Sequence, residues 1–149
     1  MALVDLIRPE VVKVPLTAGS KPEAIRELVE VLRDAGRISE VGPVYDALMA
    51  REGLGSTGLE MGIAVPHAKT PAVRSLTMAL GISPRGIDFQ AIDGQPSRIF
   101  FLLLAPPDQS GPHIEALAEI ARITKSQSFL RLLAAAGSAK EVVELFSED

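Results

Sequence analysis

The side chains best suited to chemistry in this sequence are its two histidines, His67 and His113. Imidazole titrates near neutral pH, so its neutral ring nitrogen is available as a nucleophile. His67 follows Pro66 at the end of a short apolar run, Gly62 to Pro66, where a buried strand is expected to give way to a loop. A histidine in this place can attack phosphorus and then pass the phosphoryl group on. The alternative is a structural histidine that bonds to a neighbouring group.

Other kinds of catalytic site lack the residues that they need. The chain has no cysteine, and two histidines alone supply fewer ligands than a zinc site requires. Neither a G-x-S-x-G nucleophile turn nor a Walker-type phosphate loop is present. No pair of carboxylates has a spacing that singles it out for acid–base catalysis. We therefore expect neither a metal nor a cofactor.

The segment Gly53 to Gly58, GLGSTG, matches the glycine pattern of dinucleotide-binding sites. In those sites the pattern follows a strand and opens a helix, so that the pyrophosphate meets the helix N-terminus. Here a helical pattern precedes the glycines and a strand follows them, which excludes this interpretation. Two alternatives remain. The segment is a flexible turn, or its backbone amides and the hydroxyl groups of Ser56 and Thr57 bind an oxyanion such as a phosphoryl group.

Composition and charge exclude several classes of partner and location. The net charge of −4 and the aromatic content of 4% argue against a nucleic-acid partner. The longest apolar run, Ile99 to Ala105, is far shorter than the roughly 20 residues of a membrane-spanning helix. Met1 to Val12 lacks the basic start and the apolar stretch of a signal peptide. We expect a cytoplasmic protein that forms a single domain over residues 1–149 and does not insert into a membrane.

Strand and helix patterns alternate along the chain, which predicts a single α/β domain with a mixed central β-sheet flanked by α-helices. Strands are predicted over Val11–Leu16, Gly62–Pro66, Leu76–Ser83 and Arg98–Ala105. The last of these is apolar from Ile99 to Ala105, which is typical of a strand in the middle of a sheet.

Capping patterns mark where the predicted helices begin and end. A capping box, Ser20 to Glu23, precedes an apolar repeat that can end in a left-handed cap at Gly36. A second helix is predicted around Val44–Met49. Two more follow late in the chain, over Phe129–Ala135 and Glu141–Phe146.

Another helix is predicted to begin near Pro112, because proline suits the first turn of a helix. The spacing of its apolar residues predicts which side chains face the protein interior. These side chains are those of Ile114, Leu117, Ala118 and Ala121.

Three separated blocks of the sequence resemble one known family. They are ALMAREGLGSTGLEMGIAVPHAK (Ala47 to Lys69), GIDFQAIDGQPSRIFFLLLAP (Gly86 to Pro106) and HIEALAEIAR (His113 to Arg122). In this order, and over nearly the whole chain, they are similar to the fructose/mannitol-type enzyme IIA domains of the phosphoenolpyruvate-dependent sugar phosphotransferase system. That family includes the nitrogen-regulatory IIA proteins. The resemblance implies a mixed central sheet flanked by helices.

The same resemblance implies roles for three residues. The phosphorylated histidine of the family falls on His67, its arginine near the active site on Arg51, and its second histidine on His113. Arg51 can present two parallel donors to a phosphoryl group, although the residue alone, without the family, is better interpreted as a solvated charge at a helix end. The helix N-terminus is expected to keep His113 neutral, so that it can donate a hydrogen bond to phosphate. Lys69 either adds positive potential or is a solvated loop residue.

The resemblance implies a phosphocarrier that accepts a phosphoryl group on a histidine from phospho-HPr or from its nitrogen-branch homologue. In one interpretation the protein then acts on a regulatory partner through its phosphorylation state. In the other it is a fructose- or mannitol-type IIA subunit that donates the phosphoryl group to a IIB protein. The chain ends at Asp149 without a IIB or membrane segment, and this favours the regulatory type.

Overall fold

Strand β5 (Ser97–Ala105) lies in the interior of the sheet, as its apolar sequence predicts. On one side it pairs with β4 (Thr77–Ile87), and on the other with β2 (Ile63–Ala64) and β3 (His67–Lys69). Strand β1 (Val12–Lys13) completes the sheet beside β4. The pair β4–β5 is antiparallel and all other pairs are parallel. The sheet is therefore mixed, as predicted.

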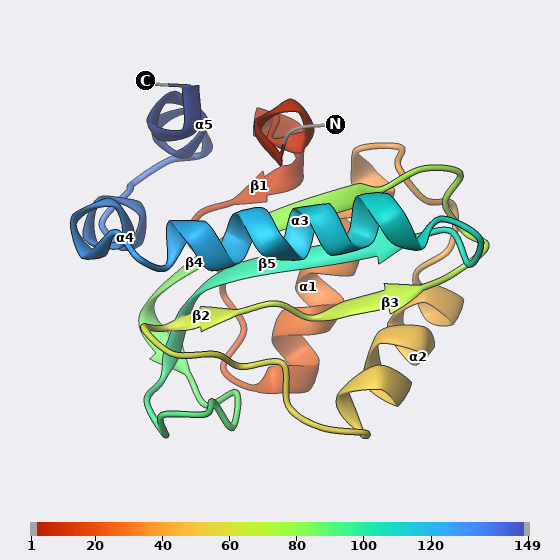
Figure 1. Ribbon diagram of the computed structural model, residues 1–149, viewed down its shortest axis with the longest axis horizontal. Coiled ribbons are helices and arrows are strands. Elements are labelled where there is room, and N and C mark those ends of the chain that lie inside the picture. Colours follow the sequence, from red (N-terminus) through yellow and green to blue (C-terminus); the bar gives the residue numbers. More distant parts are fainter. Residues whose placement is uncertain (1–2, 148–149) are drawn as a thin grey trace.

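The structure, a computed structural model, describes residues 3–147, and its helices cover both faces of the sheet (Figure 1). In this view α3 (Ser110–Ile123) crosses in front of the sheet, and α1 (Lys21–Asp34) and α2 (Val41–Glu52) lie behind it. Helices α4 (Gln127–Ala134) and α5 (Ala139–Ser147) lie at the side where the chain ends. Two 3-10 helices, Leu3–Leu6 and Pro9–Val11, precede α1. Within these described residues, no helix is both long and apolar enough to cross a membrane.

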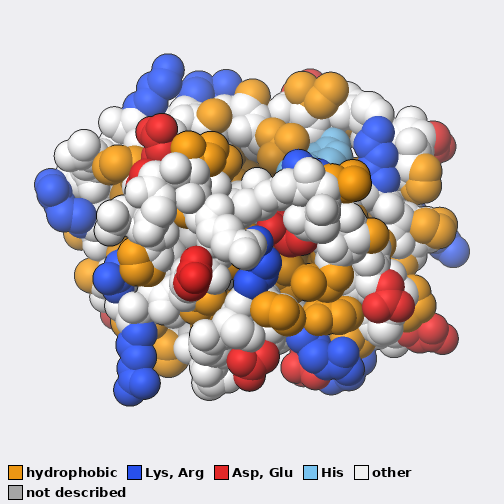
Figure 2. All heavy atoms as spheres, turned by 90° about the horizontal axis from the view of Figure 1, so that it is seen from below, with side chains coloured by type: hydrophobic (Ala, Val, Ile, Leu, Met, Phe, Trp, Pro, Cys, Tyr) orange, Lys and Arg blue, Asp and Glu red, His pale blue; other side chains and the backbone are white. Residues whose placement is uncertain are grey.

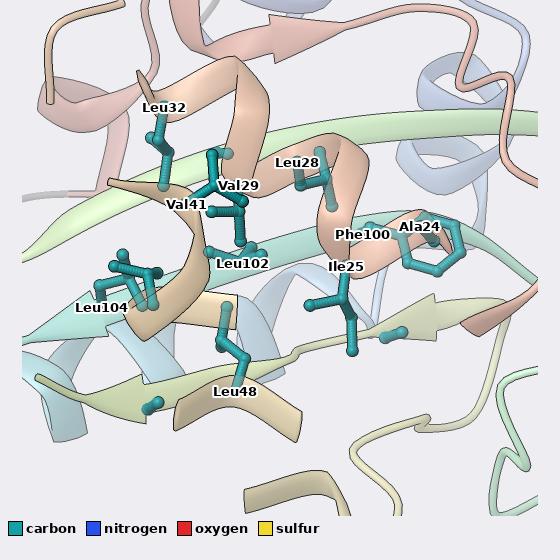
Figure 3. Packing of buried hydrophobic residues seen from close by; sticks show 14 of the residues in the cluster. Ala24, Ile25, Leu28, Val29, Leu32, Val41, Leu48, Phe100, Leu102 and Leu104 are labelled. Carbon is teal, nitrogen blue, oxygen red and sulfur yellow. The ribbon is translucent and has the colours of Figure 1, made fainter. Parts of the chain in front are cut away.

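Apolar side chains pack on both faces of β5, because successive residues of a strand point to opposite faces. Phe100, Leu102 and Leu104 pack against α1 and α2, as Figure 3 shows for this cluster. Phe101 and Leu103 face the opposite side, where they pack among residues of α3, α4 and α5. Since the strand is buried on both faces, its sequence carries no polar–apolar alternation.

The boundaries of α1 follow the capping residues that the sequence predicts. The hydroxyl of Ser20 accepts a hydrogen bond from the Glu23 N–H, and the Glu23 carboxylate accepts one from that hydroxyl at 2.8 Å. At the other end Gly36 adopts a φ of +76°, which favours glycine. The next N–H, that of Arg37, donates to the carbonyl of Leu32 at 2.9 Å and closes the helix. Both predicted ends of this helix are confirmed.

The prediction for the inward face of α3 is wrong for Ile114, Ala118 and Ala121, which are exposed, whereas Leu117 is half-buried and packs against the core. The residues buried on this helix are His113, Ala116 and Ile120, each one place before a predicted inward residue. Ile114, predicted to be buried, is 65% exposed. The buried stripe contains a histidine, so a pattern of apolar residues alone points to the wrong side of the helix. The consequence is that α3 turns His113 toward the protein interior.

The backbone around His67 also differs from the prediction. The strand expected over Gly62–Pro66 covers only Ile63–Ala64, and a new strand begins at His67 itself. Pro66 lies between the two strands and has no N–H to donate to the ladder. His67 then pairs with Leu103 of β5. The histidine is therefore held within the sheet and does not lie in a loop.

Candidate active site

One pocket of about 430 Å³ brings together three residues that the sequence predicts at the site. These are His67, His113 and Arg51, and Lys69 lines the same pocket. The other lining residues are Ala47, Ala50, Leu54 and Ala68. In Figure 2 the histidine atoms are recessed between hydrophobic and basic side chains. The pocket therefore combines an apolar wall with a concentration of cationic groups.

Three elements that are distant in the sequence position these side chains. Arg51 lies in the last turn of α2, and His67 is the first residue of β3. Helix α2 packs directly against β3, which brings the arginine beside the histidine. His113 lies near the start of α3, which packs on β5, the strand that pairs with β3. The site is thus assembled at one end of the sheet.

The imidazole of His67 is fixed by one hydrogen bond from its own segment. Its Nδ1 lies 2.7 Å from the carbonyl oxygen of Val65. A carbonyl oxygen only accepts hydrogen bonds, so Nδ1 carries the proton and donates it to this bond. The lone pair of the neutral ring is then on Nε2. In a neutral His67 ring, Nε2 is therefore the nitrogen without a proton.

His113 is a buried histidine in contact with the first one. The two ring centroids are 5.2 Å apart, and the ring planes are nearly perpendicular at 74°. His113 is 7% exposed, and its Nε2 is buried without a hydrogen-bond partner among the described residues. A buried polar atom without a partner is uncommon in folded proteins. Its position at the pocket favours an interaction with a group that enters from outside.

Burial lowers the pKa of His113 below the ordinary histidine value, and the nearby charges of His67 and Lys69 lower the pKa further. The direction agrees with the sequence prediction of a neutral ring. The main cause differs from the predicted one, because desolvation by the surrounding protein, and not the helix N-terminus, makes the largest contribution to the lowered pKa. A neutral His113 can still donate one hydrogen bond to an oxyanion.

We expect the free energy of unfolding to fall as the pH drops through about 6.5, because the unfolded chain then binds a proton that folded His113 resists. The stabilisation from the neutral ring is complete above the unfolded-state pKa and is lost toward the lower folded-state pKa. Urea unfolding of the wild type and of His113→Gln between about pH 8 and about pH 5 measures how the free energy of unfolding changes with pH. The variant should lose less stability on acidification. Equal losses in both proteins would contradict the lowered pKa.

The two cationic side chains at the pocket are held by neutral partners. Arg51 donates through Nη1 to the carbonyl of Gly55 at 2.9 Å, and Lys69 donates to the hydroxyl of Ser110 at 2.7 Å. Neither forms an ion pair with an acidic group in residues 3–147. Their positive charges are thus not neutralised by an acidic partner there. An anion in the pocket would gain from both.

The structure does not bring Ser56 and Thr57 to the lining of this pocket. The Ser56 hydroxyl donates to the carbonyl of Phe89 at 2.6 Å and accepts from the Gly58 N–H at 3.0 Å. The Thr57 hydroxyl donates to the carboxylate of Glu52, and the residue is 4% exposed. Both hydroxyl groups are thus bonded within the protein. The loop Gly53–Gly58 is a folded turn rather than an open anion-binding loop in this structure.

Sequence reasoning missed two residues around the site, Glu52 and Val65. The Glu52 side chain is 3% exposed and pairs with Lys21 at 2.9 Å. A glutamate beside an arginine at a helix end reads as a solvated charge, so its type gives no signal of burial. Val65 acts through its backbone carbonyl, which no side-chain pattern can reveal. The only sequence signal for a role of Val65 is its position two residues before His67.

The chain matches the family described as "Phosphoenolpyruvate-dependent sugar phosphotransferase system, EIIA 2" over residues 5–149. It is 34% identical to a nitrogen regulatory protein of Bradyrhizobium diazoefficiens, over 99% of this chain and 95% of that protein. It is also 34% identical to the PTS system fructose-specific EIIA component of Haloferax volcanii, over 97% of this chain and 95% of that protein. A match to the PTS system fructose-specific EIIABC component of Bacillus subtilis, at 30% identity over 99% of this chain, spans only 23% of that longer protein.

Two solved structures have the same fold as this chain. The nitrogen regulatory protein IIA-Ntr from Neisseria meningitidis superposes with a TM-score of 0.88 at 30% identity, over 97% of this chain and 99% of that one. Enzyme IIAMTL from Escherichia coli, solved in complex with phosphorylated enzyme IIBMTL, gives a TM-score of 0.78 at 26% identity, over 94% and 96%. Because the family match covers nearly the whole sequence, this chain belongs to the EIIA 2 family of the phosphoenolpyruvate-dependent sugar phosphotransferase system, a family of phosphotransferase components in a phosphohistidine relay.

Proposed function

We propose that this protein is a phosphocarrier in which Nε2 of His67 accepts a phosphoryl group from an HPr-like phosphocarrier. The observation that carries the proposal is the hydrogen bond between Nδ1 of His67 and the Val65 carbonyl, which leaves the lone pair on Nε2. The pocket around the ring holds the cationic groups of Arg51 and Lys69. A nucleophile beside uncompensated positive charge is suited to a reaction that moves a phosphoryl group.

The proposed transfer needs little covalent chemistry from the rest of the protein. The Nε2 lone pair forms a bond to phosphorus while the bond between phosphorus and the donor's histidine nitrogen breaks in line with it. The proton on Nδ1 stays in its bond to the Val65 carbonyl, which stabilises the positive charge that develops on the ring. In the reverse step the bond from Nε2 to phosphorus breaks, and the neutral His67 ring leaves. The same hydrogen bond thus serves both acceptance and donation.

The neighbouring groups are placed to bind the phosphoryl oxygens. Arg51 uses one of its donors on Gly55, and its remaining N–H groups are available to an anion. Lys69 adds a second positive charge, and Nε2 of His113 is a buried polar atom without a partner among the described residues. The charged phosphoryl oxygens stay in nearly the same place during transfer. Donors that already point at these oxygens therefore stabilise the transition state without having to rearrange.

The exchange also requires that the protein dock a donor and then a partner. Two large apolar side chains are exposed in this region: Leu54, which lines the pocket, by 85%, and Ile114, which follows the pocket residue His113 in the sequence, by 65%. Transient interfaces commonly have an apolar centre and a polar rim. We propose that these two residues lie at the centre of the docking face, and that docking takes place in the cytoplasm.

We propose that the protein is of the nitrogen-regulatory type and acts through its phosphorylation state. The TM-score of 0.88 to IIA-Ntr, against 0.78 to IIAMTL, supports this choice. The second candidate is a sugar-uptake relay that donates to a IIB protein, since a fructose-specific EIIA component is 34% identical over 97% of the chain. Phosphorylation at His67 can regulate a partner only if that partner binds the two forms with different affinity.

The test combines phosphorylation with recovery of partners. The wild-type protein is incubated with phosphoenolpyruvate, enzyme I and HPr, and intact mass spectrometry then measures whether one phosphoryl group is gained. Phosphorylated wild type and unphosphorylatable His67→Ala are next used to recover partners from native lysate. We expect a regulatory protein to be recovered by one form only. Rapid transfer to a IIB protein without any partner selective for one form would contradict the regulatory type and favour the relay.

A further inference from the structure

The buried carboxylate of Glu52 holds the loop between Arg51 and His67 against the end of α2. Glu52, the last residue of α2, accepts hydrogen bonds from Nζ of Lys21 at 2.9 Å and from the N–H of Thr57 at 3.2 Å. The hydroxyl of Thr57 donates to its other oxygen. A negative group at a helix C-terminus faces the negative end of the helix dipole, so burial there needs such compensation. The carboxylate therefore fixes the loop tightly to the end of α2.

The loop residue held by this carboxylate is connected to the imidazole of His67. The Thr57 carbonyl accepts a hydrogen bond from the N–H of Val65 at 3.0 Å. The Val65 carbonyl in turn accepts from Nδ1 of His67 at 2.7 Å. Val65 is thus held by Thr57 through its N–H and holds the ring through its carbonyl. The orientation and the tautomer of His67 depend on where Thr57 lies.

The same loop also holds Arg51. The guanidinium donates to the Gly55 carbonyl, which lies in the segment between Glu52 and Thr57. The Gly55 N–H donates to the Glu52 carbonyl at 3.1 Å, so Gly55 is bonded to both of the last residues of α2. A displacement of the loop would therefore move the carbonyl that holds the arginine. The hydrogen bonds that hold this loop therefore support both Arg51 and His67.

We propose that Glu52 and Thr57 are positioning residues that orient His67 and Arg51 for phosphoryl transfer, an inference that rests on the proposed phosphocarrier function. Neither side chain lines the pocket, so neither touches the phosphoryl group. They act together through the hydrogen bonds to Val65 and Gly55. The two bonds from Thr57 to the carboxylate hold the loop in a single place, and a misplacement of about 1 Å can cost about 100-fold in rate.

The test removes the Thr57 hydroxyl and leaves the shape of the side chain nearly unchanged. We expect Thr57→Val to accept phosphoryl from HPr about 10- to 100-fold more slowly than the wild type. Nitrogen NMR at pH above about 7.5 should show the Nδ1–H tautomer of His67 in the wild type and a mixture of tautomers in the variant. Thr57→Ser restores the hydroxyl and should return both measurements to wild-type values.

Thr70→Val is the matched control, because Thr70 is also 4% exposed and its hydroxyl oxygen accepts, among residues 3–147, a hydrogen bond from the Ala72 N–H alone, at 3.2 Å. It should change neither rate nor tautomer. A wild-type rate and a wild-type tautomer in Thr57→Val would overturn the inference. A dominant Nε2–H tautomer of His67 in the wild-type protein would also overturn it, and this measurement does not depend on the folding of any variant. Failure of the proposed function gives a different result, since the wild type itself would then gain no phosphoryl group on His67.

Discussion

Substituting His67→Ala should abolish phosphorylation of the protein by phospho-HPr. The reason is that Nε2 of His67 is the nucleophile in our account, and alanine leaves no nitrogen at this place. The side chain is half-buried and, in the part of the chain that the structure describes, its one hydrogen bond is to Val65 of its own segment, so the fold should be retained. Intact mass spectrometry after incubation with phosphoenolpyruvate, enzyme I and HPr measures the effect.

His113→Gln is the control for this experiment, because it removes the only other histidine and leaves the proposed acceptor in place. Glutamine keeps an amide donor for the phosphoryl oxygens, so this variant should still gain one phosphoryl group, but more slowly. The modification should be labile to acid and stable to base, unlike a phosphoserine. A phosphorylated His67→Ala protein would show that another residue is the acceptor.

Substituting Arg51→Ala should slow phosphoryl exchange with HPr by roughly 10²- to 10³-fold, the usual cost of removing one donor to a developing oxyanion. The guanidinium lines the pocket and has no acidic partner in the part of the chain that the structure describes. Within residues 3–147 its side chain hydrogen-bonds to a loop carbonyl alone, so its loss should change the melting temperature little. Exchange rates are measured by rapid quench with labelled phospho-HPr.

Arg51→Lys separates charge from geometry, because lysine keeps the positive charge but lacks two parallel donors. We expect it to recover part of the lost rate. Arg33→Ala serves as the control, since Arg33 lies near the end of α1 and pairs with Asp34 at 3.2 Å on the surface. A wild-type exchange rate in Arg51→Ala would show that the arginine is a bystander to the transfer.

The sequence was most informative where one residue type decides the local structure. The apolar run of β5 predicts an interior strand, and Ser20 and Gly36 predict both ends of α1, because each pattern has a direct physical cause. The first predicted strand, Val11–Leu16, pairs as β1 only over Val12–Lys13, although the N–H of Leu16 still donates to the sheet. Boundaries of short strands depend on the partner strand, which the local sequence does not specify.

The arrangement at the site depends on contacts between distant segments. The motif around His67 predicts a functional histidine, but its hydrogen bond to Val65 requires the actual backbone path between β2 and β3. The burial of His113 follows from the rotation of α3 on the sheet, which the apolar pattern misplaced by one residue. The role of Thr57 depends on the burial of Glu52. The backbone path and the burial in these examples are set by packing against other segments, even where the bonded residues are close in the sequence, so no local pattern contains them.

The central claim is that Nε2 of His67 is the nitrogen that carries the phosphoryl group. The direct measurement is nitrogen–phosphorus NMR of the phosphorylated protein labelled with ¹⁵N in its histidines, with His113→Gln used to assign the two rings. We predict a phosphorus–nitrogen coupling to Nε2 of His67 and a proton retained on Nδ1, because the Val65 carbonyl accepts from that nitrogen. Coupling to Nδ1 of His67, or to either nitrogen of His113, would contradict the account.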